Sequence, residues 1–272
     1  MAPFTPTLNP ESILALYPAR YRPIGALVGL GGGGGLSGSL LWRFESGQGP
    51  SLLRAWPNPG PDRARLEQIH AWLGQVADLG FVPYPFPGSD GRAIQEGGGR
   101  FWELVPWLEG SVDRTEPPNP SRVCDAFRAL ASVHRRWESE SALGPSPGLV
   151  DRLQELEVLH SKGFTSIESR LRATDDALLR EVAREWLDLA PAAVVPVRAM
   201  LREAITYQVP RQPCLRDVRP DHFLFLGDKL NGLIDFGAMG HESVAGDVSR
   251  LSVEWLERHA ELRGLALDAY ES

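Results

Sequence analysis

The sequence predicts an α+β fold in which a small antiparallel β-sheet precedes a mainly helical region. Hydrophobic residues make up 43% and charged residues 23% of the 272 residues, which is ordinary for a folded globular protein. The first hundred residues alternate short β-prone segments with glycine and proline, whereas the chain from Ser121 carries long patterns of helical period. The length allows one or two domains.

The first hundred residues predict a sheet accompanied by one helix. Turn-forming residues separate the β-prone segments, and residues 110–120 are rich enough in turn formers to predict a connection. Between the third and fourth strands, apolar residues recur at the spacing of one amphipathic helix. The strands are expected at Gly25–Leu30, Leu40–Phe44, Ser51–Trp56 and Phe101–Leu108, and the helix at Pro61–Leu79.

The rest of the chain predicts helices with one β-rich interruption. Two short segments, Phe223–Phe225 and Leu230–Ile234, flank a turn and predict a hairpin. Because proline stops most helices, the apolar pattern around Pro191 is divided into two helices. The helices are expected at Val123–Trp137, Leu149–His160, Asp175–Leu189, Val194–Ala204 and Ala245–Arg263.

The composition excludes several classes of protein. A net charge of −7 argues against a protein that coats nucleic acid. No apolar stretch approaches the ~18 residues of a membrane helix and the N-terminus lacks signal-peptide features, so we expect no membrane partner and a cytoplasmic location. Cys124 and Cys214 are too few for a disulfide framework and form no zinc pattern, so both are expected to be reduced, structural thiols.

Charge is unevenly distributed along the chain. Residues 1–100 carry 8 basic and 7 acidic side chains, and residues 101–272 carry 20 and 28. An acidic second region attracts a cationic substrate. Solvated helix faces that are rich in Asp and Glu explain the same excess of acidic residues. The charge distribution therefore does not distinguish a cationic substrate from an acidic, solvated surface.

A glycine run at residues 29–38 lies between two β-prone segments. A dinucleotide-binding fold needs a helix after such glycines, but the next segment, Leu40–Phe44, is β-like. A strand, a glycine loop and a second strand instead form a flap whose backbone amides cover phosphates. The candidate nucleotide-binding residues are Gly31, Gly32, Gly33 and Gly34, and a flexible surface turn is the alternative.

The strongest chemical signal is the segment LRDVRPDH at residues 215–222, followed by the predicted hairpin and by IDFG at residues 234–237. This is the order of a phosphoryl-transfer catalytic loop and metal loop. One carboxylate orients the attacking hydroxyl, and a second holds the metal ion that bridges the phosphates. Asp217 is the candidate catalytic base and Asp235 the candidate metal ligand, and we expect both at the mouth of one cleft.

These motifs resemble the aminoglycoside phosphotransferase and choline kinase-like family, which shares the protein-kinase fold. The family's His-Gly-Asp, its Asn five residues later and its Ile-Asp-Phe are similar to residues 215–217, His222 and residues 234–236. The resemblance implies a protein-kinase-like two-lobed fold, with a small antiparallel β-sheet N-lobe at residues 1–103, a hinge at 104–110 and a mainly helical C-lobe at 111–272.

The same resemblance implies roles for three further residues. GDVSRL at residues 246–251 is similar to the family's Gly-Asp-x-x-x-Asp-Leu, which makes Asp247 the expected brace of the catalytic loop. LVPWLEG at residues 104–110 is similar to the hinge, where the carbonyl of Pro106 and the amide of Leu108 would bind adenine. Proline keeps its carbonyl, so it is compatible with this role.

The chain departs from the family's pattern in the first lobe. The family has a lysine on the third strand that contacts the α and β phosphates, and Arg54 stands there, with Glu67 on the following helix as its expected ion-pair partner. Arginine keeps the charge but not the shape of lysine. A cation on the strand surface without a phosphate role is the alternative.

Two further departures lie in the catalytic loop. His222 replaces the metal-binding Asn. Because an imidazole favours softer metals than Mg²⁺, Mn²⁺ is an alternative to Mg²⁺ as the bound ion. A hydrogen-bonding structural histidine is the alternative. Leu215 and Arg216 replace the His-Gly that precedes the catalytic Asp.

The sequence therefore predicts an ATP-dependent phosphotransferase that moves the γ-phosphoryl group to a hydroxyl of a small molecule, with ATP and Mg²⁺ bound. An inactive nucleotide-binding pseudokinase or scaffold is the first alternative. A metal-dependent phosphohydrolase that uses Asp217, Asp221, His222 and Asp235 is the second. Neither the acceptor nor the oligomeric state follows from the sequence.

Overall fold

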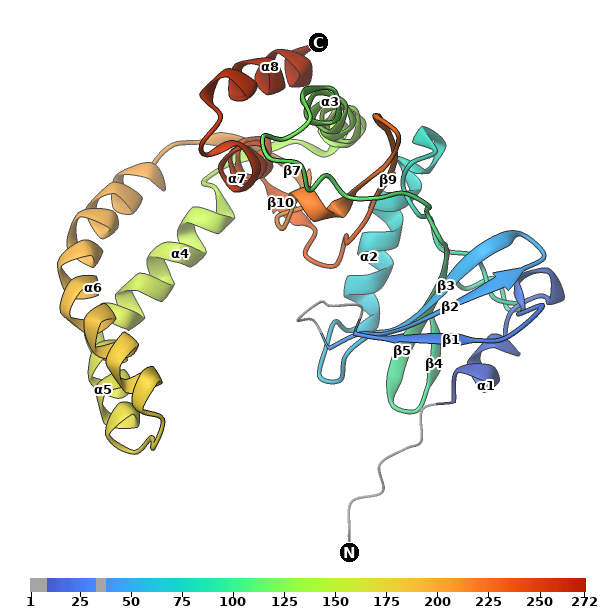
Figure 1. The fold of residues 1–272 in the computed structure, drawn as a ribbon, viewed down its shortest axis with the longest axis horizontal. Helices are drawn as coiled ribbons and strands as arrows, with labels where there is room; N and C mark the ends of the chain where they lie inside the picture. Colours follow the sequence, from blue (N-terminus) through green and yellow to red (C-terminus); the bar gives the residue numbers. More distant parts are fainter. Residues whose placement is uncertain (1–8, 33–37) are drawn as a thin grey trace, which may run out of the picture. The chain divides into compact units, whose positions relative to one another are not determined.

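The computed structural model describes residues 9–32 and 38–272 (Figure 1). The chain divides into two compact units, each built from segments far apart in sequence. The first contains Met1–Trp137, Asp217–Met239 and Val248–Ser272, and the second contains Glu138–Arg216 and Gly240–Asp247. An antiparallel sheet near the N-terminus and helices after it confirm the predicted α+β class.

The first unit contains a five-stranded antiparallel sheet with the strand order β1-β2-β3-β5-β4. One face of β3 and β5 carries Leu53, Trp102 and Leu104, which are fully buried and pack with Ile13 and Tyr17. Because side chains alternate along a strand, the neighbouring residues point to the opposite face. The strands are β1 (Val28–Gly31), β2 (Leu40–Ser46), β3 (Gly49–Ala55), β4 (Gln95–Gly97) and β5 (Arg100–Pro106), and α1 covers Pro10–Leu14.

Helix α2 (Arg63–Gly74) contributes its apolar stripe to the same unit. The side chain of Asp62 caps it by accepting a hydrogen bond from the amide of Arg65 at 2.8 Å. Leu66, Ile69 and Leu73 are buried, as their spacing predicts. The helix is shorter than expected, because its last predicted residues form a separate 3₁₀ turn at Ala77–Leu79.

The remainder of the first unit combines helices with the predicted hairpin. Helix α3 (Pro120–Trp137) packs against α8 (Ala260–Glu271), and its Asp125 carboxylate accepts a hydrogen bond from the amide of Leu230 in β9 at 2.8 Å. Strands β8 (Phe223–Leu226) and β9 (Lys229–Leu233) pair antiparallel around a turn in which Gly227 has a φ of +60°. The hairpin prediction is therefore confirmed.

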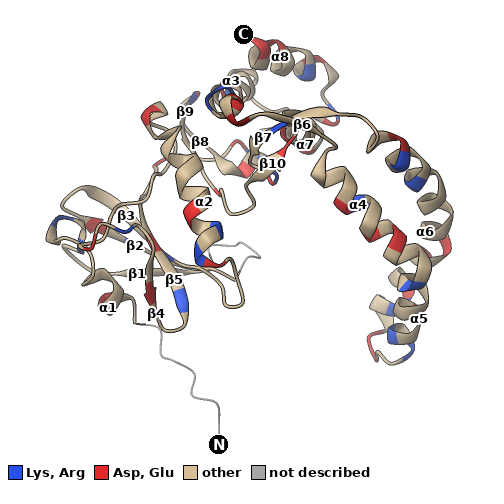
Figure 2. Cartoon of the chain, turned by 180° about the vertical axis from the view of Figure 1, so that it is seen from behind, with Lys and Arg blue, Asp and Glu red and all other residues tan. Residues whose placement is uncertain are grey.

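The second unit contains a small sheet, β10-β7-β6, and an arm of helices. The strands are β6 (Ala142–Gly144), β7 (Val209–Cys214) and β10 (Gly240–Glu242), and the helices are α4 (Pro147–Val158), α5 (Phe164–Arg172) and α6 (Ala177–Ala204). A π-helical turn at Leu159–Gly163 joins α4 to α5. Basic and acidic residues are interspersed along α4 and α6, as on solvated helices (Figure 2).

Two helix predictions are wrong. Helix α6 runs without interruption through Pro191 and Pro196, which are both exposed, so water can bind the carbonyl groups that lose their intrahelical partner. The expected closing helix is two helices: α7 (Val244–Leu256) ends before His259, whose backbone is not helical (φ −127°, ψ 70°), and α8 begins at Ala260. Leu262 of α8 is buried. None of the described helices has the length and apolar content needed to cross a bilayer.

Candidate active site

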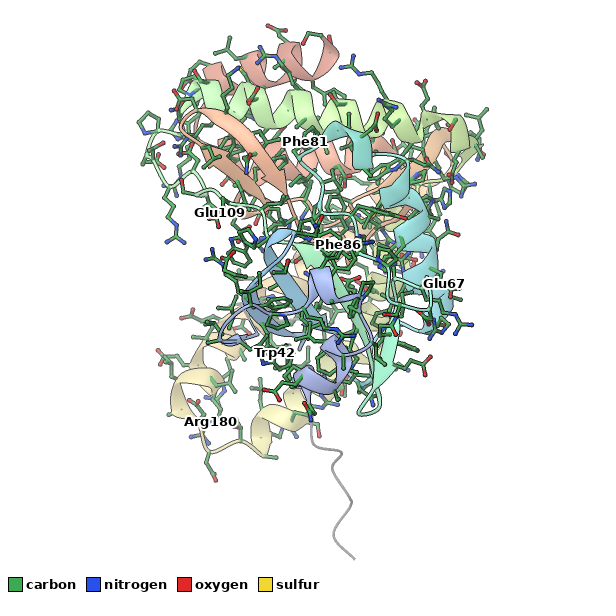
Figure 3. All side chains as sticks on the ribbon, turned by 90° about the vertical axis from the view of Figure 1, so that its right-hand side faces the viewer. Trp42, Glu67, Phe81, Phe86, Glu109 and Arg180 are labelled. Carbon is green, nitrogen blue, oxygen red and sulfur yellow. The ribbon has the colours of Figure 1, made fainter. Side chains whose placement is uncertain are left out.

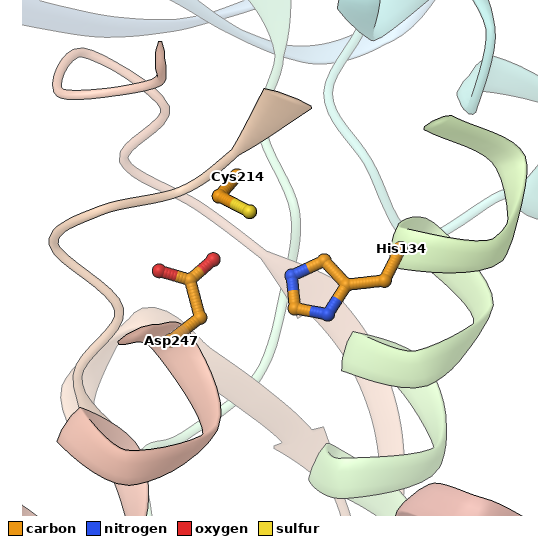
Figure 4. A group of neighbouring side chains, drawn as sticks. All are labelled: His134, Cys214 and Asp247. Carbon is orange, nitrogen blue, oxygen red and sulfur yellow. The ribbon is translucent and has the colours of Figure 1, made fainter. Parts of the chain in front are cut away.

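Asp247 holds the backbone immediately before Asp217. Its carboxylate accepts hydrogen bonds from the amides of Leu215 at 2.7 Å and Arg216 at 2.8 Å, and the residue is 1% exposed. Figure 4 shows this carboxylate with the side chain of Cys214. Burial and the nearby carboxylates of Asp247 and Glu242 raise the pKa of the Cys214 thiol, which is unpaired as predicted.

Two residues of the candidate site adopt a backbone conformation that favours glycine. Arg216 and Asp235 both have φ near +65°, and they are the only non-glycine residues with positive φ in the described ranges. Such a conformation costs about 1 kcal/mol or more for a residue with a Cβ, and it concentrates at functional sites. The strain therefore lies immediately before one candidate carboxylate and at the other.

Asp217 belongs to a network of ion pairs. Its side chain is 45% exposed, and its Oδ1 lies 2.6 Å from Nη2 of Arg250 in α7. Arg219 lies 3.2 Å from Asp221 and 3.3 Å from Glu254, which also lies 3.8 Å from Arg250. Arg250 was not predicted from the sequence, because in GDVSRL it occupies the third position that Gly-Asp-x-x-x-Asp-Leu leaves unspecified, and the position of the second Asp is Leu251.

The β8–β9 hairpin brings His222 and Asp235 together. The amide of Ile234 donates to the carbonyl of His222 at 3.0 Å, which aligns the two ends of the hairpin. Nε2 of His222 then lies 3.8 Å from Oδ2 of Asp235 and 3.9 Å from Oδ1 of Asp221. His222 is buried, and its Nδ1 has no hydrogen-bond partner among the described residues.

This donor set fits a divalent cation. The half-exposed carboxylate of Asp235 supplies the hard oxygen ligand that Mg²⁺ and Mn²⁺ share, and the imidazole of His222 suits Mn²⁺ better than Mg²⁺. Ions of this type complete their coordination with phosphate oxygens and water, so two protein ligands are sufficient. The bound ion would neutralise charge on the phosphates of a nucleotide.

A cavity of about 290 Å³ in the first unit adjoins these residues, near the lower end of the range for small-molecule sites. It contains Asp235, and Pro106 and Leu108 line it at the end of β5, where the hinge was predicted. Its other polar lining groups include Arg54 and Glu103. Its apolar walls include Leu30, Leu41, Leu52, Ile69, Leu73 and Val105.

The ion-pair partner predicted for Arg54 is wrong. Nη1 of Arg54 lies 3.6 Å from Oε1 of Glu103, directly across from it in the β3–β5 ladder. Glu67 instead lies 3.6 Å from Arg63 and is 60% exposed on the outer side of α2 (Figure 3). The register of the sheet, which the sequence does not specify, makes Glu103 the neighbour. Glu103 is the only acidic residue in the otherwise largely apolar β5, and this sequence feature could have indicated a paired, buried carboxylate.

Glu103 is held between two basic side chains. Its Oε2 lies 2.7 Å from Nε2 of His70 in α2, and Glu103 is only 6% exposed. Burial raises the pKa of Glu103, but the hydrogen bond with His70 and the charge of Arg54 outweigh it, so the pKa lies below its usual value. The carboxylate therefore stays ionised in the core.

The glycine run is only partly described. Gly31 ends β1 with a φ of +60°, and Gly32 lies in the turn that follows. Gly33 and Gly34 fall outside the described residues. Leu30, directly before the run, lines the cavity, so the described start of the run borders the candidate nucleotide site.

Comparison with known proteins places this geometry in a family. The model of the phosphotransferase enzyme family matches residues 33–271. A homoserine kinase of Rhizobium meliloti (strain 1021) is 28% identical over 197 residues, which are 71% of this chain and 54% of the relative. The chain thus spans about half the length of the curated relatives it matches.

Two solved structures share the fold. An aminoglycoside phosphotransferase from Alicyclobacillus acidocaldarius subsp. acidocaldarius DSM 446 aligns with a TM-score of 0.62 and 14% identity, over 97% of this chain and 77% of that one. The amicoumacin kinase hAmiN, in complex with AMP-PNP, Ca²⁺ and Ami, aligns with a TM-score of 0.61 and 11% identity, over 94% and 73%. The fold, the order of the motifs and the family match agree: the chain belongs to the phosphotransferase enzyme family.

Proposed function

We propose that the protein transfers the γ-phosphoryl group of ATP to a hydroxyl group of a small molecule. One observation carries the proposal: the hairpin holds His222 3.8 Å from Asp235, and Asp235 lines a largely apolar cavity that reaches Pro106 at the end of β5. A cation site next to an apolar pocket is what a metal–nucleotide complex requires.

The proposed roles follow the groups that line the cavity. Adenine lies between the apolar walls and bonds to the carbonyl of Pro106 and the amide of Leu108. Arg54 contacts the phosphates, and Asp235 and His222 hold a divalent cation, Mg²⁺ or Mn²⁺. The proposed lobes are residues 1–103 and 111–272, joined by residues 104–110.

Asp217 is the proposed base. It orients the acceptor hydroxyl and accepts its proton as the oxygen attacks the γ-phosphorus and the bond to the leaving ADP oxygen breaks. Its exposure leaves room for an acceptor beside it. The acidic excess of residues 101–272 favours an acceptor that carries an amine, such as an amino sugar, a choline-like alcohol or a hydroxy amino acid.

The test is ADP release with ATP and either Mg²⁺ or Mn²⁺, in the presence of homoserine, choline, an amino sugar or a neutral sugar. We expect one of these hydroxyl compounds to accelerate ADP release well above the rate with ATP alone. Mass spectrometry of the product then shows the added phosphoryl group. If no compound in a wide panel of hydroxyl compounds accelerates ADP release, the proposal is contradicted.

A second candidate function is nucleotide binding without turnover, as in a scaffold. The observation that favours it is the ion pair between Arg250 and Asp217, which occupies an oxygen that the acceptor hydroxyl needs. Stabilisation of the protein by ATP and metal, measured as a rise in melting temperature, together with no ADP release for any acceptor, would select this function.

A further inference from the structure

The register of the sheet places Arg54 and Glu103 opposite each other on the face that lines the cavity. The side chain of Arg54 is 21% exposed, and its guanidinium lies over the ring of Trp56 at 4.9 Å. Glu103 is its only charged partner within the described ranges. Glu103 therefore contacts one edge of the guanidinium, and the other N–H groups of Arg54 can donate hydrogen bonds to a ligand in the cavity.

His70 binds the second oxygen of the same carboxylate. An ionised carboxylate has no proton to donate, so Nε2 of His70 is the donor in the 2.7 Å hydrogen bond to Glu103. Both residues are buried, and His70 belongs to α2. Helix α2 is thereby linked through Glu103 to the strand that carries Arg54.

Protein kinases hold the corresponding strand cation with a glutamate from the helix. In this chain the helix contributes His70 instead, and the carboxylate comes from the neighbouring strand β5. A buried carboxylate that lost either partner would carry a large desolvation penalty, so the three side chains constrain one another.

We propose that Glu103 and His70 are positioning residues that hold the guanidinium of Arg54 for the phosphates of the nucleotide. This inference rests on the proposed function, because it assigns Arg54 to the phosphates. Glu103 and His70 act on the phosphates through Arg54. Arg54, Glu103 and His70 together form what we call the arginine triad.

The test measures the affinity of the protein for ATP, ADP and adenosine by calorimetry, for wild type and for Arg54→Gln, Glu103→Gln and the double variant. We expect each single variant to weaken ATP and ADP binding by about tenfold, the range of one charged hydrogen bond, and to leave adenosine binding unchanged. The double variant should bind ATP no more weakly than Arg54→Gln alone, because Glu103 acts only through Arg54.

Controls separate positioning from a merely structural effect. Glu67→Gln, which removes the exposed carboxylate of α2, should bind ATP as wild type does. His70→Gln keeps a donor and should retain more ATP affinity than His70→Phe, which has none; this pair also serves if Glu103→Gln fails to fold.

Four outcomes would overturn parts of the proposal. Wild-type ATP affinity in Glu103→Gln, or equal losses for adenosine and ATP, would overturn the arginine triad while the proposed function stands. Additive losses in the double variant would do the same. Wild-type protein that binds no adenine nucleotide would overturn the proposed function and the phosphate role of Arg54 together.

Discussion

The first unit contains two clusters of charged side chains that differ mainly in burial. The arginine triad lies in the core between β3, β5 and α2, with Glu103 almost fully buried. The second cluster joins Asp217, Arg219 and Arg250 with other acidic side chains at the surface, and Asp217 is nearly half exposed. Buried pairs are costly to break, whereas exposed pairs contribute at most about 1 kcal/mol. The buried triad suits Arg54, a cation proposed to stay fixed against the phosphates. The exposed cluster suits Asp217, a proposed base that must exchange its ion pair for the acceptor hydroxyl.

The largest expected effect concerns the base. Asp217→Asn should lower turnover by about a thousandfold, the size of a general-base contribution, because an amide cannot accept the proton. The affinity for ATP should stay close to wild type, since Asp217 does not line the cavity. Steady-state ADP release and calorimetry measure the two quantities. Unchanged turnover would remove Asp217 from the mechanism.

The contrast in burial predicts a contrast in stability. Glu103→Ala should lower the free energy of unfolding by about 3 kcal/mol, because it leaves Arg54 and His70 without the carboxylate in the core. Glu254→Ala, which removes a partly exposed carboxylate from the surface cluster, should cost about 1 kcal/mol or less. Urea unfolding of both variants measures the difference, and equal losses would show that burial does not separate the clusters.

The ionised state of Glu103 predicts a dependence on pH. Its pKa is lower in the folded protein than the usual 4.5, so its contribution to stability is complete above pH 4.5 and is lost as the pH falls through the folded-state value. The difference in melting temperature between wild type and Glu103→Gln should therefore be constant near neutrality and shrink below pH 4.5. A difference that grows on acidification would contradict this sign.

A smaller effect tests whether the surface cluster restrains the base. Arg250→Gln should raise turnover by up to about fivefold, the equivalent of one exposed ion pair, because Oδ1 of Asp217 is then free for the acceptor hydroxyl. Arg258→Gln, which removes an arginine for which no ion pair is found among the described residues, is the control. A loss of turnover in Arg250→Gln would instead assign Arg250 a supporting role in catalysis.

The smallest effect concerns backbone strain before Asp217. Arg216→Gly should raise the free energy of unfolding by about 0.5 kcal/mol, because glycine adopts a φ of +65° without steric cost. The gain is reduced by the loss of the exposed ion pair with Asp151 and by the greater entropy of the unfolded chain. Arg216→Ala loses the ion pair but keeps the strain, so it should not be stabilised.

Much of the candidate site could be predicted because it is local in sequence. His222 and Asp235 are joined by a hairpin whose short strands and tight turn are visible as a sequence pattern, and the structure brings the two side chains within 3.8 Å. Helix α6, which was predicted as two helices, shows that a local sequence pattern can also mislead. There a strong local signal, Pro191, gave the wrong boundary because its exposed position lets water replace the lost hydrogen bond.

By itself the sequence determined the α+β class, the β8–β9 hairpin and the segments that contain Asp217, His222 and Asp235, because these depend on periodicity, turn residues and spacing along the chain. The order of its motifs indicated the family. Only the tertiary structure decided which charges meet. Glu103 became the partner of Arg54 through the register of β3 and β5, and Arg250 reached Asp217 through the placement of α7. Such pairs join residues far apart in the chain, and their energies depend on burial, which a sequence pattern does not encode.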